Sequence, residues 1–287
     1  MSSQQRAKYL LELLRCKVFE STFLIKTMIA TWNVNSLKIR LPQVIDWLKE
    51  NPVDFLCLQE LKQDNEFFDL AAFEEIGYTA CWSGQKTYNG VATISRTEAK
   101  DVIRNNPLFE DKQQRLIAAS YDSEQGPIRV INVYCPNGSA VDSDKYEYKL
   151  AWYKELTNFL KSEMEKYEHL VITGDFNIAP EDRDVHEGYK GDILISPPER
   201  AALQELIDLG LHDAFRLFEQ EEKSFSWWDY RMMGFRRNAG VRIDHILITD
   251  SLKPMCEASW IDKEPRRLER PSDHTPVVAD IKWHLTK

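Results

Sequence analysis

Short runs rich in β-branched and aromatic residues recur along this chain and limit the folds open to it. Such runs predict β-strands, and segments with apolar residues at helical spacing separate some of them. Other runs, between residues 91 and 134, follow one another without a helical segment. A strictly alternating βαβ fold is therefore excluded, and a mixed α/β (α+β) layered architecture is expected.

The individual elements follow from these patterns. The predicted strands are Met28–Trp32, Phe55–Leu58, Val91–Ile94, Leu116–Ser120, Ile128–Tyr134, Leu170–Thr173, Ile243–Ile248 and Val277–Ile281. The predicted helices are Leu41–Lys49, Tyr146–Tyr167 and Pro198–Leu209. The last of these follows Ser196 and Pro197, a capping residue and a proline of the kind that begins helices.

No repeat, low-complexity linker or Pro/Gly-rich hinge interrupts the body of the chain. We therefore expect one domain over residues 28–287, preceded by an N-terminal extension, residues 1–27, with the pattern of an amphipathic helix. Residues 179–196 form the longest irregular stretch. Long loops in compact domains tend to be functional, which makes this segment a candidate part of a site.

Composition limits where the chain works. Its 43% hydrophobic content allows a sizeable core and excludes global disorder. No run approaches the roughly 18 apolar residues of a membrane span, so no membrane partner is expected. The five cysteines form neither a zinc-binding spacing nor a disulfide framework, which favours a reducing cytoplasm.

The net charge of −9 argues at first against a polyanionic partner. The charge is unevenly distributed, however. Residues 223–287 hold 12 Lys and Arg against 9 Asp and Glu, so the acidic excess lies in the rest of the chain. A locally basic face that binds nucleic acid is compatible with this distribution.

Carboxylate and carboxamide residues gather at the ends of the predicted strands, where loops can converge on one rim. The motifs are Trp32-Asn33-Val34-Asn35, Leu58-Gln59-Glu60, Asn132-Val133-Tyr134, Gly174-Asp175-Phe176-Asn177, Arg242-Ile243-Asp244 and Ser272-Asp273-His274. Hard oxygen donors without thiolates suit Mg²⁺, with Mn²⁺ as a substitute, and Glu60 is the first candidate ligand. His274 beside a carboxylate could stabilise charge that develops on a phosphoryl group.

Each motif alone has a simpler interpretation. An isolated Gly-Asp-x-Asn is most often a turn whose side chain bonds its own backbone. Glu60 alone would be a solvated charge at a strand end, and Asn33 a turn residue. The joint occurrence of the motifs in one chain order is what indicates a hydrolytic site.

Aromatic residues alternate with arginines in residues 225–237, which contain Trp227, Arg231, Arg236 and Arg237. A core strand with an exposed basic turn would give the same pattern. The alternative is a surface on which aromatic faces stack on bases or sugars while arginines reach phosphates. The position of the segment just before Asp244 favours the second interpretation.

The motifs, together with Gly84-Gln85-Lys86, occur in the order found in the exonuclease III type of the exonuclease/endonuclease/phosphatase superfamily. The chain resembles this family from Met28 to its C-terminus, about nine-tenths of its length. The resemblance implies a four-layered α/β sandwich, two packed mixed sheets flanked by helices. It also implies a monomeric, Mg²⁺-dependent DNA-repair exodeoxyribonuclease. Its substrate would be double-stranded DNA with 3′ ends, where it acts as a 3′–5′ exonuclease and 3′-phosphatase, or with abasic sites.

Residue roles follow from the same resemblance. Glu60 would bind the metal, with Asn33, Asn35 and Asp273 near it. The catalytic group would be Asp175, which positions the attacking water, with Asn177, Tyr134, His274 and Asp244, the last two as a pair. Contacts with DNA would come from Lys86, Arg115, Arg231, Arg236 and Arg237. A small apolar pocket for a flipped, base-less sugar would be formed by Trp227, Val241 and Ile243.

Two features depart from the family pattern. Met28 matches a family start, so we expect residues 1–27 to reflect an upstream start that is not used. Leu194 and Ile195 are bulkier than an open abasic pocket requires. They put abasic-site incision in doubt and leave the 3′-end activities in place.

Two other functions compete with this one. A superfamily phosphatase acting on inositol phosphates or lipids is disfavoured by the Arg/Trp-rich segment. A catalytically silent DNA-end-binding module is disfavoured by the complete set of Glu60, Asp175, Asn177, Asp244 and His274.

Overall fold

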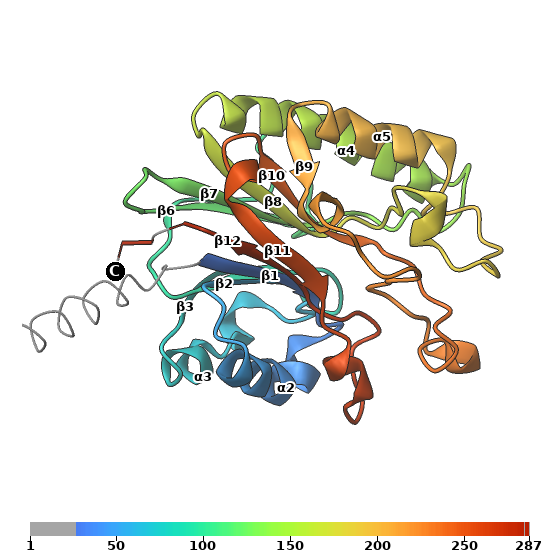
Figure 1. The fold of residues 1–287 in the computed structure, drawn as a ribbon, viewed down its shortest axis with the longest axis horizontal. Coiled ribbons are helices and arrows are strands. Elements are labelled where there is room, and N and C mark those ends of the chain that lie inside the picture. Colours follow the sequence, from blue (N-terminus) through green and yellow to red (C-terminus); the bar gives the residue numbers. More distant parts are fainter. Residues whose placement is uncertain (1–26, 284, 287) are drawn as a thin grey trace, which may run out of the picture.

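Two six-stranded sheets pack face to face and form the centre of the fold (Figure 1). The computed structural model describes residues 27–283, 285 and 286, so the extension, apart from Thr27, and its predicted helix lie outside the described residues. The strand orders are β11-β12-β1-β2-β4-β3 and β5-β6-β7-β8-β10-β9. Within each sheet one neighbouring pair is parallel, β1 with β2 and β7 with β8. Both sheets are therefore mixed, as expected.

The first sheet consists of β1 (Thr27–Asn33), β2 (Phe55–Gln59), β3 (Thr79–Ser83), β4 (Val91–Ser95), β11 (Cys256–Ile261) and β12 (Val277–Ile281). The second consists of β5 (Lys100–Arg104), β6 (Leu116–Tyr121), β7 (Ile128–Tyr134), β8 (His169–Asp175), β9 (Leu211–Asp213) and β10 (Asp244–Thr249). The α-helices are α2 (Leu37–Glu50), α3 (Leu70–Glu74), α4 (Asp144–Met164) and α5 (Pro197–Ile207). Short 3₁₀ turns are Asn65–Phe67, Asp182–Asp184, Ala214–Leu217, Arg231–Met233, Lys253–Met255 and Glu264–Arg267.

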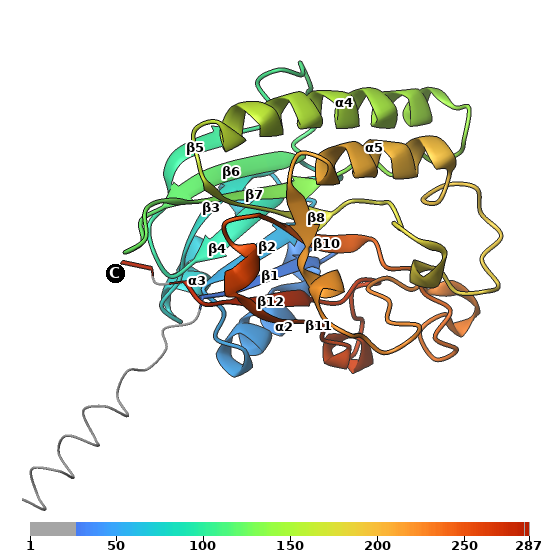
Figure 2. The same ribbon diagram turned by 45° about the horizontal axis from the view of Figure 1, so that its top comes forward.

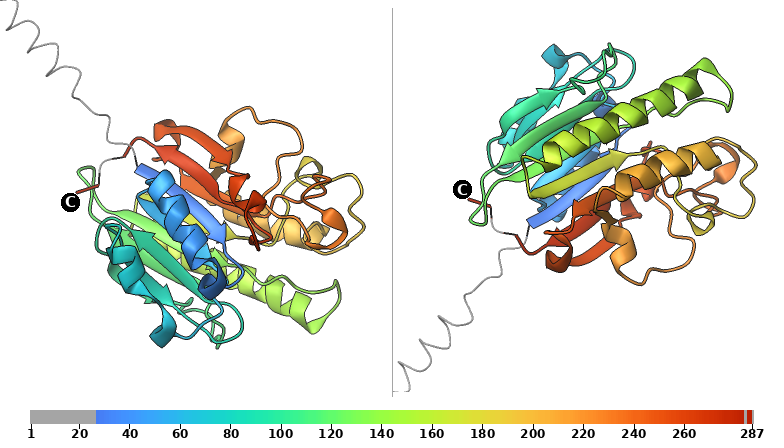
Figure 3. Two further views of the ribbon diagram at one scale, coloured as in Figure 1. Left: turned by 90° about the horizontal axis from the view of Figure 1, so that it is seen from below. Right: turned by 90° about the horizontal axis from the view of Figure 1, so that it is seen from above.

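Helices cover the outer face of each sheet, which gives four layers. Figures 2 and 3 show α2 and α3 on the first sheet and α4 and α5 side by side on the second. Alternating residues of a strand point to opposite faces, so a strand buried on both faces reads as a continuous apolar run. In β1, Ile29 belongs to the core between the sheets, whereas Ala30 and Trp32 pack under α2. The four-layered sandwich is confirmed.

The eight predicted strands and three predicted helices are all present, but four strands and the short α3 were missed. The missed strands, β3, β5, β9 and β11, are the four sheet edges. Edge strands are short or carry polar side chains that discourage pairing with other chains, and this weakens the apolar pattern. Lys100 and Asp101 in β5 illustrate this, since both are exposed.

The start of α5 follows the predicted capping signal. Ser196 and Glu199 form a reciprocal capping box, and Pro197 occupies the first turn. Helix α4 begins after Ser143, whose side chain accepts a hydrogen bond from the backbone of Tyr146. Across residues 27–283, 285 and 286, none of the helices has the length and apolar character needed to cross a bilayer.

Candidate active site

The strand register brings the polar strand ends together on one rim. Asp175, the last residue of β8, lies opposite Tyr134 in the parallel neighbour β7 and opposite Asp244 in the antiparallel neighbour β10. In the other sheet, Asn33 and Gln59 end the parallel strands β1 and β2 side by side. Glu60 follows β2 with a left-handed backbone (φ 54°), which turns the chain at this rim.

Asn33 joins the two sheets at the centre of the site. Its Nδ2 donates to Glu60 Oε1 at 2.9 Å and to Asp175 Oδ2 at 2.9 Å. Its Oδ1 accepts from the backbone of Asn35. Since Asn33 is fully buried, both carboxylates are held by an amide that cannot turn to solvent.

His274 and Asp244 form a buried pair beside Asp175. Nδ1 of His274 lies 2.9 Å from Asp244 Oδ2, and Nε2 lies 3.7 Å from Asp175 Oδ2. Burial alone lowers the pKa of His274, but the charges of Asp244 and Asp175 outweigh it and raise the pKa to about 10. The imidazole is therefore a cation at neutral pH, with its Nε2 edge directed to the site.

Asp175 and Tyr134 are tuned in a complementary way. Burial raises the pKa of Asp175, His274 opposes the shift and Asp244 adds to it. Burial, then the charges of Glu60 and Asp175, raise the pKa of Tyr134 well above its ordinary value. Tyr134 therefore keeps its hydroxyl proton and can donate a hydrogen bond. The raised pKa of Asp175, about 7, makes this carboxylate a suitable proton acceptor near neutral pH.

A cation site is present at the same place. Ligand atoms of Glu60, Asp175 and His274 all lie within 4.8 Å of one another. Lys62 Nζ contacts Glu60 Oε2 at 2.8 Å and occupies one side of that carboxylate. Two carboxylates with a neighbouring amide match the hard oxygen set that Mg²⁺ prefers. A cationic His274 repels a metal, so the ligands that fit are Glu60 and Asp175.

Asn35 and Asp273 lie beside this group but are bonded to other residues. Asn35 Nδ2 donates to Asp273 Oδ1 at 2.9 Å, and its Oδ1 accepts from Lys62 Nζ at 2.5 Å. The other Asp273 oxygen accepts from Trp227 Nε1 at 3.0 Å. Burial raises the pKa of Asp273, but the charge of His274 and these hydrogen bonds outweigh it and lower the pKa. Both residues form the wall beside the site.

The residues predicted to form an apolar pocket lie together in one buried cluster. Val241 and Ile243 are buried and pack with Ala179 and Leu194, with Trp227 against the same cluster. Leu194 is 3% exposed and has a left-handed backbone (φ 74°). The long irregular loop at residues 179–196 therefore contributes a buried side chain, Leu194, to this cluster.

The predicted basic residues fall into two groups. Lys86, Arg231, Arg236 and Arg237 are exposed, and Arg231 is paired with Asp229. Arg115 differs from them in its burial. Its guanidinium stacks 4.8 Å from the centre of the Tyr134 ring and donates to the Tyr134 carbonyl, which orients Tyr134.

Several residues of the site were not singled out from the sequence. Ser226 donates to Asp244 Oδ2 at 2.6 Å and fixes that carboxylate. Asn137 donates from Nδ2 to Asn177 Oδ1 at 3.0 Å. A serine in an aromatic segment and an Asn-Gly pair after a strand are ordinary loop features, so no local signal marked them. Lys62 lies only two residues after the candidate ligand Glu60, and this short spacing could have marked it as a residue of the site.

The motif residues Gln59 and Asn132 serve the fold. Gln59 Nε2 donates to Asn132 Oδ1 at 2.8 Å between the sheets, and both side chains are fully buried. A hydrogen-bonded polar pair at this depth helps to fix the register of one sheet on the other.

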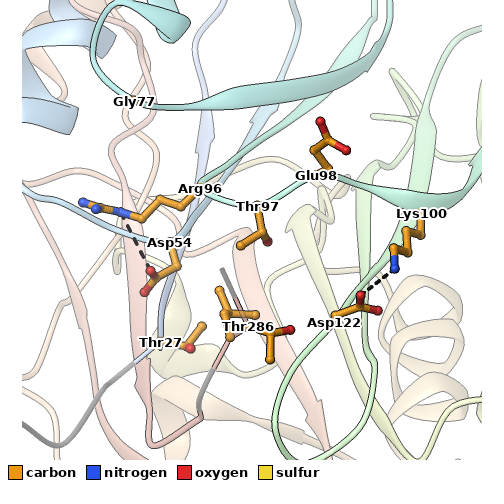
Figure 4. A pocket seen from close by; sticks show the side chains of 10 residues that line it. Thr27, Asp54, Gly77, Arg96, Thr97, Glu98, Lys100, Asp122 and Thr286 are labelled. Atoms are coloured by element: carbon orange, nitrogen blue, oxygen red, sulfur yellow. Dashed lines mark hydrogen bonds and ion pairs between the residues drawn. The ribbon is translucent and has the colours of Figure 1, made fainter.

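One sizeable cavity lies away from this rim. It measures about 740 Å³ and is lined by residues at the other ends of the strands, such as Thr27, Asp54 and Lys100 (Figure 4). Two smaller hollows border the site. One, of about 450 Å³, includes Tyr134 and Asn137, and the other, of about 420 Å³, includes Lys62 and Lys86. The rim is the candidate active site, because the charged and proton-transferring groups converge there.

The His274–Asp244 geometry leads to a pH prediction. A raised histidine pKa means that activity requiring the cation persists until the pH rises through that value, about 10. In Asp244→Asn the main raising charge is gone while burial still lowers the pKa. The alkaline fall in kcat is therefore expected at lower pH, with lower kcat throughout. The measurement is a pH–rate profile at saturating DNA with metal occupancy verified, and identical alkaline limbs would contradict the paired arrangement.

Comparison with known proteins places these findings in context. Residues 30–274 match the Endonuclease/Exonuclease/phosphatase family. Exodeoxyribonuclease III of Haemophilus influenzae is 37% identical, with 88% of this chain and 98% of that protein aligned. The 3′ phosphatase NExo from Neisseria, solved with a product DNA hairpin, has 47% identity and a TM-score of 0.86, covering 90% of this chain and 100% of that one. An AP endonuclease from Archaeoglobus fulgidus has 40% identity and a TM-score of 0.83, covering 89% and 99%.

Proposed function

Because this chain belongs to the endonuclease/exonuclease/phosphatase family, we propose that it is a Mg²⁺-dependent DNA-repair hydrolase acting mainly at 3′ ends. Its activities would be 3′–5′ exonuclease and 3′-phosphatase. The observation that carries the proposal is the buried group of Asp175, His274 and Asp244 next to a carboxylate cation site. The names of its relatives, an exodeoxyribonuclease III and a 3′ phosphatase, support it.

The proposed chemistry uses groups already in place. Mg²⁺ would be held by Glu60 and Asp175, whose carboxylates the Asn33 amide keeps in place, and would neutralise charge on the phosphoryl group. Asp175 would orient the attacking water and take its proton. Cationic His274 would stabilise charge on a phosphoryl oxygen, and Tyr134 would donate a hydrogen bond to another.

The preference for 3′ ends follows from the filled pocket. A flipped, base-less sugar needs the space that Leu194 occupies against Val241 and Ile243. A terminal phosphate or nucleotide needs only the open rim. Incision at internal abasic sites is therefore expected to be much weaker than the 3′-end activities.

Opening the pocket should reverse that preference. Leu194→Gly removes the side chain and suits the left-handed backbone at this position. Loss of a buried leucine costs about 2–5 kcal/mol of stability, partly offset by about 1 kcal/mol of relieved backbone strain. We expect abasic-site incision to rise at least about tenfold, the ratio that corresponds to roughly 1.4 kcal/mol, with 3′-phosphatase activity retained. Leu194→Met, which keeps the pocket filled, is the control, and an equal gain in both variants would contradict the pocket's role.

DNA binding should weaken steeply with salt despite the acidic net charge, because it depends on local phosphate contacts. Reversing Arg236 and Arg237 to Glu is expected to lower the affinity and to reduce the salt slope by roughly 0.9 for each phosphate that is no longer neutralised. Lys253→Glu with Lys282→Glu makes the same charge change at exposed positions away from the rim. Equal effects of the two double variants in a binding titration would place Arg236 and Arg237 off the DNA.

One substrate panel separates this function from its rivals. It contains duplexes with an internal abasic site, a recessed 3′-hydroxyl and a 3′-phosphate, together with an inositol phosphate, each with Mg²⁺ and with chelator. An inositol phosphatase would release phosphate from inositol phosphates and leave every duplex intact. A silent end-binding module would bind the duplexes and cleave none of them.

We further propose that the protein acts as a monomer in the cytoplasm. The cysteines of the described residues, Cys57, Cys81, Cys135 and Cys256, are free thiols, which suits a reducing compartment. A mass measurement by light scattering at working concentration tests the monomer, and a dimer would overturn it.

A further inference from the structure

A buried ion pair lies directly behind the active site. Lys149 projects from α4 and Glu199 from α5, the two neighbouring helices over the second sheet (Figure 3). Both side chains are fully buried. Burial lowers the pKa of Lys149, and the charge of Glu199 opposes that shift, so the ammonium depends on its counter-ion.

All three hydrogens of the Lys149 ammonium have acceptors. Besides Glu199, Nζ donates to the carbonyl of Asn177 at 2.7 Å and to the carbonyl of Asn137 at 3.1 Å. These two residues lie on separate loops, one after β8 and one after β7. A single buried cation thus holds both loops from below.

The two loops meet in the site above the ammonium. Asn137 Nδ2 donates to Asn177 Oδ1, and Asn177 Nδ2 donates to the Cys135 carbonyl at 3.0 Å. The backbone amide of Asn177 donates to Asp175 Oδ1 at 2.9 Å. Asn177 has a left-handed backbone (φ 51°), a conformation that asparagine tolerates better than most residues. Lys149 is therefore one hydrogen bond from the residue that orients the Asp175 carboxylate.

Glu199 holds the other side of the site. Its Oε1, which accepts from Lys149, also accepts from the backbone of Leu194 at 3.0 Å. Its Oε2 accepts from the backbone and hydroxyl of Ser196. The same carboxylate therefore fixes the start of α5 and the residue that fills the apolar pocket.

Stability alone does not explain this pair. Removing two charges from water is costly, and a well-packed apolar pair of similar volume is often at least as stable. An apolar pair could hold α4 against α5, but it could not donate to the carbonyls of Asn137 and Asn177. The specific capacity of Lys149 lies in those two contacts.

We propose that Lys149, with Glu199 as its counter-ion, is a positioning residue that fixes the Asn137–Asn177 contact and through it the carboxylate of Asp175. It touches no substrate. This role rests on the proposed function, because Asp175 is taken to orient the attacking water. Its loss is expected to lower turnover and to leave substrate binding nearly unchanged.

The test compares two buried ion pairs, each of which has one member on α4. Lys149→Met/Glu199→Gln removes both charges at the site. The matched control, Arg129→Met/Glu163→Gln, removes a pair of similar burial that joins α4 to β7 near the opposite end of that strand from Tyr134. Each is assayed for kcat and KM on a duplex with a 3′-phosphate, with the folded fraction measured by circular dichroism. Lys149→Met alone is assayed as well. If this single variant does not fold, the comparison rests on the kcat and KM of Lys149→Met/Glu199→Gln.

The expected result is a kcat about 100-fold lower for the Lys149 variants, since small misplacements of reacting groups cost that much, with KM within about threefold. The control should match the wild-type kcat per folded molecule. Adding Asn137→Ala to the Lys149 double variant should lower kcat little further, because both changes break one unit.

Equal kcat losses in the two buried-pair variants would overturn the positioning role, as would a fully additive effect of Asn137→Ala. A wild-type protein that leaves the 3′-phosphate and the phosphodiesters intact would instead overturn the proposed function. The two failures are therefore distinguishable.

Discussion

Asp175→Asn is expected to lower kcat by at least about 1,000-fold, at the upper end of what one transition-state group contributes. The amide keeps the size of the side chain and can still accept at Oδ1 from the Asn177 backbone. It cannot take a proton from water, and it meets Asn33 Nδ2 with a second donor where Oδ2 now accepts. The loss should therefore appear in turnover.

The DNA affinity of Asp175→Asn shows whether Asp175 acts in turnover or in DNA binding. The variant should bind a 3′-phosphoryl duplex at least as tightly as the wild type, because removing a negative charge from the rim lessens its repulsion of phosphate. Single-turnover kinetics with a parallel binding titration measure both quantities. A loss of affinity that equals the loss of activity, at unchanged turnover, would show that Asp175 serves binding alone.

Glu60→Gln is expected to lower the activity about 100-fold or more at ordinary Mg²⁺ concentrations. The substitution preserves volume but removes the charge that would hold the cation. It also leaves Lys62 without its 2.8 Å partner, so a positive charge faces the metal position. Activity should recover partly at high Mg²⁺, because the defect is one of occupancy.

The control variant for Glu60→Gln changes Lys62, the partner of Glu60 in the ion pair. Lys62→Met removes the ammonium and keeps the carboxylate, so metal should bind at least as well as in the wild type. Metal titrations of activity in both variants provide the measurement, with chelator as the blank. Full activity of Glu60→Gln at low Mg²⁺ would remove Glu60 from the metal site.

The confirmed elements of the fold are those whose signals are local. Central strands such as β1 and β2 are buried on both faces and read as apolar runs, whatever their partners are. The start of α5 is specified by the capping box of Ser196 and Glu199. The edge strands carry no such signal, because their polar side chains resemble those of loops.

The site was predicted unevenly for a related reason. The order of the motifs indicated that Glu60, Asp175, Asp244 and His274 belong together, and the structure brings them into one group, in which Glu60 is partly exposed and the other three are buried. The order of the motifs did not indicate which neighbouring side chains these residues contact through hydrogen bonds. Asn35, expected near the metal, bonds Asp273 and Lys62. The hydrogen-bond partner of each side chain depends on small differences in distance between side chains that come from separate strands.

The class of fold, the rim where polar residues collect and the chemistry available there follow from periodicity and residue type, so the chain's own pattern is enough to predict them. The packing of Leu194 in the apolar cluster and the burial of the Lys149–Glu199 pair depend instead on contacts between segments far apart in the chain. Residues 149 and 199 are distant in the chain, and each alone is an ordinary charged residue on a helix. Their burial, and with it their effect on Asp175, exists only once α4 and α5 pack on the same sheet.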